Sequence, residues 1–397
     1  MNQQSNPESN PDRHDCIVML IAFTIFALLA LSLNAVSFQF NLPSESILYQ
    51  AHSAPEFFAL EPVKEKKVAH KETPDSVRAL YMTSWVAATP KIRTRIVDLL
   101  DKTEANAVVI DIKDDTGRIA FLPKNEWLLE LGAGVNRITD IDEFIDDLHT
   151  HDVYVIGRVS VFQDPHLVKM RPGLAVRRVS DGGVWQDRKG LTWIDAGASE
   201  AWDYVIAIAK EAHSRGFDEI NFDYIRYPTD GNMEDIVFTH AGNRPRQNVI
   251  GEFFAYLSYS LQGEDFKISA DLFGMTTTEL GDMGIGQVLE SALKYFDYVA
   301  PMVYPSHFGP GVYGVSDPAS QPYAIVYHAM SVAALRATAA STTPLKLRPW
   351  LQDFDLGAVY TADLVRAQMQ ATYDAGLTSW MMWDPSNRYT RAAYLNE

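Results

Sequence analysis

The chain has 397 residues, of which 47% are hydrophobic, so it is long and apolar enough to bury a large core. Its 34 Lys and Arg residues stand against 51 Asp and Glu residues, and the formal net charge of -17 argues against a nucleic-acid partner because it repels phosphate backbones. A single cysteine, Cys16, excludes an internal disulfide framework and a zinc site built from several thiolates.

The first feature along the chain is the apolar run CIVMLIAFTIFALLALSLNAV, residues 16–36, which contains no charged side chain. At about 1.5 Å per residue, a helix of this length crosses a hydrocarbon layer of about 30 Å. We expect residues 16–38 to be a transmembrane anchor that follows a cytoplasmic tail, 1–15. The alternatives are a signal peptide, cleaved after small residues that end at Ser37, or a buried core helix.

Residues 39–75 carry four scattered prolines and no sustained hydrophobic period, so we expect a linker between the membrane and a folded domain. The arrangement predicts export of that domain. It would then lie in the periplasm or outside the cell, anchored to the inner membrane, or be secreted if the N-terminal segment is cleaved.

From residue 76 onward, short apolar runs alternate with longer amphipathic segments. The apolar runs predict eight strands, at 77–85, 106–113, 153–159, 218–225, 267–273, 297–304, 345–352 and 378–383. The amphipathic segments predict helices at 90–103, 138–151, 200–215, 247–262, 285–294, 321–338 and 361–375, with a last one after Asn387. Eight strand-helix units predict a (β/α)8 TIM barrel over 76–397, and a doubly wound sheet is the alternative.

One connection, residues 160–199 after the third strand, is far longer than the usual ~2 to 6 residues. We expect this loop to form part of a substrate wall that brings Trp185, Trp193 and Asp195 towards the barrel mouth. The alternative is a structural flap.

In a barrel of this kind, functional side chains stand at the C-terminal ends of the strands. Alternation along the fourth strand puts Asp223 on the same face as Asn221, and the fifth strand places Asp271 likewise, so both acids should point into the mouth. The predicted strand ends also carry aromatic, basic and further acidic side chains, namely Trp85, Asp111, Lys113, Arg158, Arg226, Tyr304, Gln352, Asp353, Trp383 and Asp384.

Two carboxyls that are desolvated together repel each other and divide their protonation, so that one can act as an acid while the other stays an anion. Asp223 and Asp271 are therefore the candidate catalytic pair, with Arg226 as the expected charge partner of Asp223. The alternative for Asp223 is an ion-pair or turn residue. A structural role is equally open for Asp353 and Asp384, which lie beside turn signals.

The aromatic residues Trp85, Trp350 and Trp383 either pack in the core or stack on sugar rings, and together with carboxylates they suit a carbohydrate substrate. The segment GPGVYG matches a dinucleotide-binding pattern literally, but no helical pattern follows it. His149 and His151 are two apart on a predicted helix and diverge, so we expect surface residues. No cofactor and no metal site are expected.

Seven segments together resemble the putative glycosyl hydrolase domain family of bacterial proteins: VVIDIKDDTG, RVSVFQDP, GFDEINFDYIRYPTDG, SADLFG, APMVYPSHF, RPWLQDF and MMWDPSN. The resemblance covers essentially 76–397 and implies a glycosidase-like (β/α)8 barrel, distantly similar to the α-amylase clan. In that clan the nucleophile is an Asp that ends strand four, which Asp223 matches. The acid is a Glu that ends strand five, where this chain has Asp271.

A further Asp follows strand seven in that clan, near Asp353 here, and the clan has an Arg where this chain has Asn221. The resemblance and the carboxylate pair together predict a membrane-tethered glycoside hydrolase that acts on an envelope or extracellular polysaccharide. Neighbouring strands lie ~4.8 Å apart, which favours the ~5 to 5.5 Å carboxyl separation of a retaining pair. The alternatives are a non-catalytic carbohydrate-binding barrel tethered to the membrane, and a barrel enzyme of other chemistry such as a lyase. The oligomeric state stays open.

Overall fold

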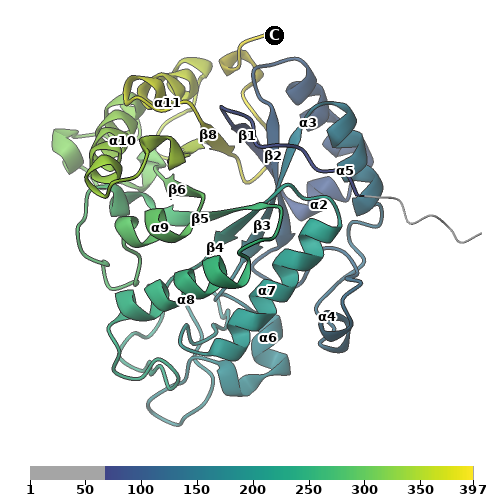
Figure 1. Ribbon diagram of the computed structural model, residues 1–397. Coiled ribbons are helices and arrows are strands. Elements are labelled where there is room, and N and C mark those ends of the chain that lie inside the picture. The colour runs from purple at the N-terminus through teal and green to yellow at the C-terminus, as the bar shows by residue number, and fades with distance from the viewer. Residues whose placement is uncertain (1–67, 397) are drawn as a thin grey trace, which may run out of the picture. The chain divides into compact units, whose positions relative to one another are not determined.

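Eight parallel strands form a closed barrel in which each strand pairs with its neighbour in chain order and β8 pairs with β1 (Figure 1). The structure is a computed structural model and describes residues 68–396. The strands are β1 (Arg78–Met82), β2 (Ala107–Lys113), β3 (Tyr154–Ser160), β4 (Glu219–Asp223), β5 (Lys267–Phe273), β6 (Tyr298–Met302), β7 (Trp350–Gln352) and β8 (Trp380–Trp383). The predicted (β/α)8 barrel is confirmed.

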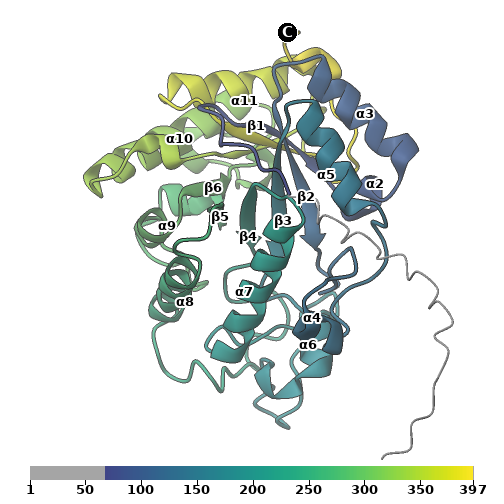
Figure 2. The same ribbon diagram turned by 45° about the vertical axis from the view of Figure 1, so that its right-hand side comes forward.

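Helices surround the barrel and connect its strands (Figures 1 and 2). The first helix after each of β1, β2 and β3 is short, namely α2 (Ser84–Ala87), α4 (Glu126–Glu130) and α6 (Pro165–Met170). The longer ones are α3 (Pro90–Asp101), α5 (Ile141–Thr150), α7 (Ser199–Ser214), α8 (Arg246–Ser260), α9 (Leu289–Tyr295), α10 (Pro322–Ala339) and α11 (Ala362–Asp374). Each of the seven helices predicted between the strands is present.

The strand side chains divide between the two sides of the barrel wall. Those that face outward pack under the helices in the larger apolar cluster, as Leu80 and Val108 do. Those that face inward form a second cluster, which includes Ala79, Tyr81, Val109, Ile156, Ala300 and Trp350. Alternate residues thus serve opposite faces, as strand geometry requires. The polar side chains of the site occupy inward positions of the same strands.

Three element boundaries differ from the sequence-based prediction. The first strand ends at Met82, because the Thr83 hydroxyl accepts from the Val86 amide and starts α2. The seventh strand keeps only its last three residues, since a 3-10 turn at Pro344–Lys346 occupies the start of the predicted run. The helix expected after Asn387 is a single 3-10 turn, Arg391–Ala393.

The long connection after β3 is held together by its own buried side chains. Trp185 and Trp193 are each 1% exposed, and their indole nitrogens donate to the Asn232 carbonyl (2.9 Å) and to Asp187 (3.1 Å). The Asp195 carboxylate accepts from the main-chain nitrogens of Gly197, His240 and Ala241. All three side chains are buried in contacts within and between the loops after β3 and β4, as expected for the alternative, a structural flap.

The tail 1–15, the anchor or signal segment 16–38 and the linker as far as residue 67 lie outside the described residues. Over 68–396, the structure holds no helix that is both long enough and apolar enough to cross a membrane. Residues 68–75, the end of the predicted linker, bond to the floor of the barrel, where the strands begin. The Lys71 amide donates to Asp218 (2.7 Å), and the Thr73 and Tyr154 hydroxyls share a hydrogen bond (3.0 Å).

Candidate active site

The guanidinium of Arg158 is the centre of a buried charged cluster inside the barrel mouth. Its Nη1 donates to Asp111 (2.6 Å), and its Nη2 donates to Asp223. Its Nε lies 3.6 Å from an oxygen of Asp271. All four side chains are buried, so one cation and three acids share a volume from which bulk water is excluded.

Strand register places these four residues in two successive layers of the barrel. Asp111 pairs with Arg158, which pairs with Asn221 on β4 and through it with Ser269 on β5. Asp223 and Asp271 therefore stand two residues nearer the mouth than this layer, on the same inward face. The long Arg158 side chain reaches up to both of them. The inward orientation predicted for Asp223 and Asp271 is what the structure shows.

Asp223 is fixed by the backbone that follows it. The Tyr224 amide donates to the Asp223 Oδ1 (2.5 Å), while the Oδ2 binds Arg158. Tyr224 has φ +53°, in the left-handed region that a bulky residue rarely adopts. Strain of this kind persists where the surrounding structure holds it, and it gathers at functional sites. Here it turns the chain sharply at the end of β4 and leaves the carboxylate at the mouth.

Asp271 is fixed by two hydrogen bonds and lies near the charge of Asp223. Its Oδ1 accepts from the Asn221 amide nitrogen (2.9 Å) and from the Trp350 indole nitrogen (2.8 Å). Burial, followed by the repulsion of Asp223, raises the pKa of the Asp271 carboxyl to about 8. Burial and the neighbouring Asp223 thus favour the protonated form of Asp271.

An aromatic wall closes the other side of the cluster. The Tyr81 hydroxyl donates to Asp111 (2.5 Å), and burial raises the pKa of the Asp111 carboxyl. The Tyr81 ring stacks on Trp383 with centroids 3.8 Å apart, and the Arg158 guanidinium lies 5.1 Å from the same Trp383 ring. Trp383 thus packs between Tyr81 and the charged cluster, beside the acids.

Two predicted site residues make different contacts from those expected. Arg226 forms no ion pair with Asp223: its Nη1 donates to the Tyr227 carbonyl (2.9 Å), and its guanidinium lies over the Phe273 and Trp193 rings. The predicted charge partner of Asp223 is therefore corrected to Arg158. Lys113 forms a buried ion pair with Asp164 (2.8 Å), which ties β2 to the loop after β3.

Three other predicted residues hold connections near the mouth. Gln352 Oε1 accepts from the Ser306 amide (3.2 Å) and hydroxyl (2.9 Å), which pins the turn after β6. Asp353 accepts from the Tyr394 hydroxyl and the Thr390 amide, both at 2.9 Å, and burial raises its pKa to about 6. Asp384 accepts from the Ser386 amide (2.6 Å) within its own turn, and burial raises its pKa.

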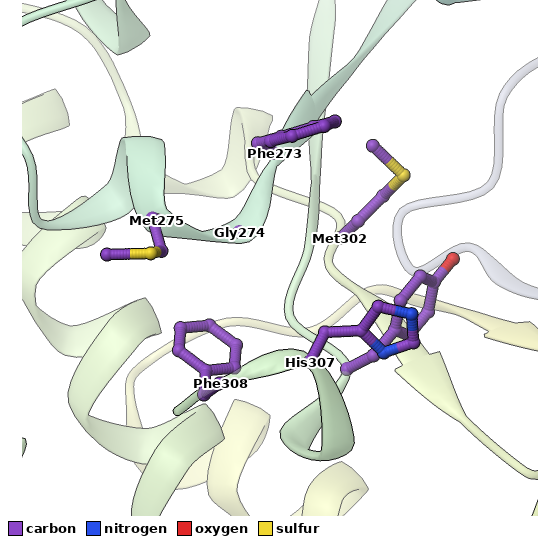
Figure 3. A pocket seen from close by; sticks show the side chains of 7 residues that line it. Phe273, Gly274, Met275, Met302, His307 and Phe308 are labelled. Carbon is purple, nitrogen blue, oxygen red and sulfur yellow. The ribbon is translucent and has the colours of Figure 1, made fainter. Parts of the chain in front are cut away.

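The remaining aromatic candidates, Tyr304, Trp350 and Trp85, differ in their burial and their contacts. Tyr304 is buried beside the cluster, 6.5 Å from Trp383 between ring centroids, and it lines an apolar pocket (Figure 3). Trp350 is fully buried and serves as a donor to Asp271, whereas Trp85 is 65% exposed on α2 and packs on Arg137. Among residues 68–396, no group of His, Cys, Asp and Glu side chains is arranged to hold a metal ion.

Tyr81 and Asn221 contact the acids although neither was predicted to be a site residue, and Trp350, a candidate for core packing or sugar stacking, donates to Asp271. All three occupy inward strand positions: Tyr81 and Trp350 belong to the inward apolar cluster, and Asn221 pairs with Arg158. The alternation that identified Asp223 and Asp271 therefore also carries the signal for them. Alternation along one strand does not reveal which residues of other strands a side chain contacts. Trp350 reaches Asp271 from β7, two strands away.

Comparison with known proteins places this barrel in a family. A family model described as a putative glycosyl hydrolase domain matches residues 79–389. Among curated proteins, no match was found. The glycoside hydrolase domain of PgaB (BpsB) from Bordetella bronchiseptica is 15% identical, with a TM-score of 0.57 over 81% of this chain and 99% of that one, and this likeness shows the fold alone.

Two further solved structures have lower TM-scores. A hypothetical protein from Ruminiclostridium thermocellum is 38% identical over 48% of this chain and 96% of its own, with a TM-score of 0.45. The spore cortex-lytic enzyme SleL from Bacillus megaterium is 12% identical over 80% of this chain and 72% of its own, with a TM-score of 0.47. The family model spans residues 79–389, which hold nearly all of the barrel. The chain therefore belongs to the putative glycosyl hydrolase domain family and is, by that membership, a glycosidase.

Proposed function

We propose that this protein cleaves an envelope or extracellular polysaccharide with retention of anomeric configuration, with Asp223 and Asp271 as its two catalytic carboxyls. The observation that carries the proposal is the unequal environment of two acids at neighbouring strand ends. Asp223 is bound by Arg158, while burial and the nearby Asp223 charge favour the protonated form of Asp271. One fixed anion and one buried acid are the pair that glycoside hydrolysis needs.

The steps follow from these protonation states. Asp271 donates its proton to the glycosidic oxygen as the bond from that oxygen to the anomeric carbon breaks. The Asp223 carboxylate attacks the anomeric carbon from the opposite side and forms a glycosyl-enzyme ester. Asp271, now a carboxylate, takes a proton from the water that hydrolyses this ester, which restores both groups.

The positions of the two carboxyls relative to the Arg158 guanidinium support retention. Asp223 binds Nη2 and Asp271 approaches Nε, so both carboxyls lie along one edge of the same guanidinium. This arrangement suits the ~5 to 5.5 Å spacing of a retaining pair better than the ~6.5 to 9.5 Å that leaves room for an inverting water. Asp111, Tyr304 and Trp383 border the acids and would contact the sugar.

The other predicted binding residues support the mouth through contacts already made. Lys113 and Gln352 hold loops after β3 and β6, and Asp353 and Asp384 hold the C-terminal segment. Arg226 lies beside Phe273 at the rim. We assign these five to positioning the mouth and its substrate, without a bond-making role.

The test is release of reducing ends from a panel of bacterial envelope polysaccharides by the full-length protein. Asp223→Asn and Asp271→Asn should each lower turnover by about 10³-fold or more, because the amide keeps the shape of the carboxyl and loses its charge or its proton. Asp98→Asn, which changes an exposed acid on α3, is the matched control and should keep full activity.

Other outcomes would support a different catalytic residue, a different stereochemistry or a different function. Near-normal turnover by Asp223→Asn removes that residue from the mechanism and makes Asp111 and Asp384 the next candidates. Proton NMR of the first-formed product should show the anomer of the substrate, and the opposite anomer would contradict retention. Binding without release by the unchanged protein identifies a carbohydrate-binding barrel, and unsaturated products identify a lyase.

We also propose that residues 16–38 tether the enzyme to the inner membrane with the barrel in the periplasm or outside the cell, or direct its secretion. The apolar run without charges supports this placement.

A further inference from the structure

An apolar pocket of about 380 Å³ opens beside the acids at the ends of β5 and β6. Figure 3 shows Met275 and Phe308 on one side of this space and Met302 and His307 on the other, with the edge of Phe273 above them. Tyr304 completes the lining where the pocket comes nearest to the acids. Two segments of chain, 273–275 and 302–308, supply every one of these side chains.

Strand register ties the pocket to the catalytic pair. Phe273 is the next inward position beyond Asp271 on β5, and it pairs with Met302 on β6. A group bound in the pocket therefore lies one step further out along the same inward face as the Asp271 carboxyl. Gly274 allows the two strand ends to stay close, because a Cβ there would lie 2.4 Å from the Met302 carbonyl oxygen.

The lining carries no formal charge. Phenyl rings and thioethers make up most of it, and the Tyr304 hydroxyl and the His307 imidazole are its polar side-chain groups. Burial lowers the pKa of His307, and burial together with Asp271 raises the pKa of Tyr304, so both are neutral near pH 7. The Asp223 carboxylate near the pocket disfavours anionic groups, and the apolar walls disfavour a free ammonium.

A bare sugar ring is a poor match for such walls, because each buried hydroxyl needs a hydrogen-bond partner. An acyl substituent fits better. Its carbonyl can accept from the single phenolic donor, and its methyl or alkyl part can pack on the methionine and phenylalanine side chains. The His307 turn is also held in place by the contacts of Gln352 with Ser306, so the pocket is formed in advance.

We propose that this pocket receives the acyl group of an N-acylated or O-acylated sugar whose ring is bound at Asp223 and Asp271, so that the enzyme selects acylated polysaccharide. The inference rests on the proposed function and adds the substrate class. The Tyr304 hydroxyl bonds the acyl carbonyl, and Met275, Met302 and Phe308 enclose its apolar part.

The experiment measures binding of paired oligosaccharides to the full-length Asp223→Asn protein, which should not turn them over. The pairs are chito-oligosaccharides against cello-oligosaccharides, which differ at one substituent, and O-acetylated against deacetylated xylo- and glucomanno-oligosaccharides. The acylated member of a bound pair should bind about tenfold more tightly, since an acetyl group buries an apolar methyl and adds a hydrogen bond.

Two further changes on this background identify the pocket as the source of the preference. Met275→Glu places a charge on the pocket wall at a residue 40% exposed, and it should remove the preference while the affinity for the unacylated member stays the same. Met170→Glu makes the same change at a methionine on α6 that is 37% exposed and outside the pocket, so it should leave the preference intact. Tyr304→Phe should reduce the preference and keep the fold, as checked by thermal unfolding.

Equal binding of the two members of each pair, or a preference that survives Met275→Glu, would overturn the inference and leave the proposed function standing. If the protein neither binds any of the oligosaccharides nor releases reducing ends from any polysaccharide in the envelope panel, the proposed function fails and the inference with it.

Discussion

Arg158 and Asp223 form a buried ion pair in which the guanidinium Nη2 binds the carboxylate Oδ2. The same guanidinium binds Asp111 and approaches Asp271, so a single cation from β3 balances acids from β2, β4 and β5. Burying acids together is costly unless a cation or protons compensate their charge. The stability of the mouth therefore depends on Arg158 and on the protonation of the cluster.

Replacing Arg158 with Gln should lower the free energy of unfolding by about 3 to 5 kcal/mol, because it leaves buried carboxyls without their cation. Urea denaturation at pH 7 measures this change. Arg178→Gln is the control, since Arg178 pairs with Asp181 at the surface and its loss should change little. Equal urea midpoints for the Arg158 variant and the unchanged protein would show that the cluster does not need its cation.

Stability should fall as pH rises through the range in which Asp271 titrates. The pKa of an Asp is about 3.9 in an unfolded chain, and burial raises it to about 8 in the fold. Between these values the folded protein holds a proton that the unfolded chain has released, so a rise in pH favours unfolding. Asp271→Asn should flatten the curve of unfolding free energy against pH between about pH 6 and 8.

Below about pH 6 a fall should persist in that variant, because burial raises the pKa of Asp353 to about 6 and the same sign applies there. The turnover of a confirmed substrate by the unchanged enzyme should also decline above about pH 8, as Asp271 loses the proton it donates. A stability curve that is identical with and without Asp271 would contradict the assignment of a raised pKa to this residue.

Trp185→Ala should lower the free energy of unfolding by about 3 to 5 kcal/mol, since it empties a large space in a packed loop. Trp185 is fully buried and donates to the Asn232 carbonyl. Trp85→Ala removes an equally large side chain that is mostly exposed and should cost far less. Thermal and urea unfolding of both variants make the comparison. Similar losses would mean that burial does not distinguish the two tryptophans.

The predicted anchor can be tested by fractionation. In a Gram-negative host, the full-length protein should sediment with the inner membrane, and protease added to spheroplasts should remove the barrel. A variant without residues 1–38 should stay in the soluble fraction inside the cell. A barrel that remains protected until the cells are lysed would show that the orientation is wrong.

Much of the barrel and half of its site can be predicted from strand alternation. Asp223 and Asp271 each follow an inward residue at a spacing of two, and their shared face follows from that period alone. Lys113 breaks the same rule: it is two residues after Asp111, but the pairing of β2 with β3 shifts between them. Lys113 therefore does not continue the series of inward-facing residues, and it pairs with Asp164. An irregular register of this kind leaves no mark in the hydrophobic pattern.

Arg226 shows a second limit. It is three residues from Asp223, which suggested a local ion pair, but the left-handed conformation of Tyr224 turns the chain between them. Arg226 then lies against the Phe273 and Trp193 rings, while Arg158, 65 positions before Asp223, binds the carboxylate. Backbone strain and cross-barrel partners depend on the assembled wall, so neither can be derived from one strand at a time.

The hydrogen bonds of Lys71 and Thr73 fix where the chain joins the barrel. Both residues bond to the floor, at the end opposite the acids. The described chain therefore enters the barrel at its floor, and residues 68–75 stay clear of the strand ends that carry Asp223 and Asp271.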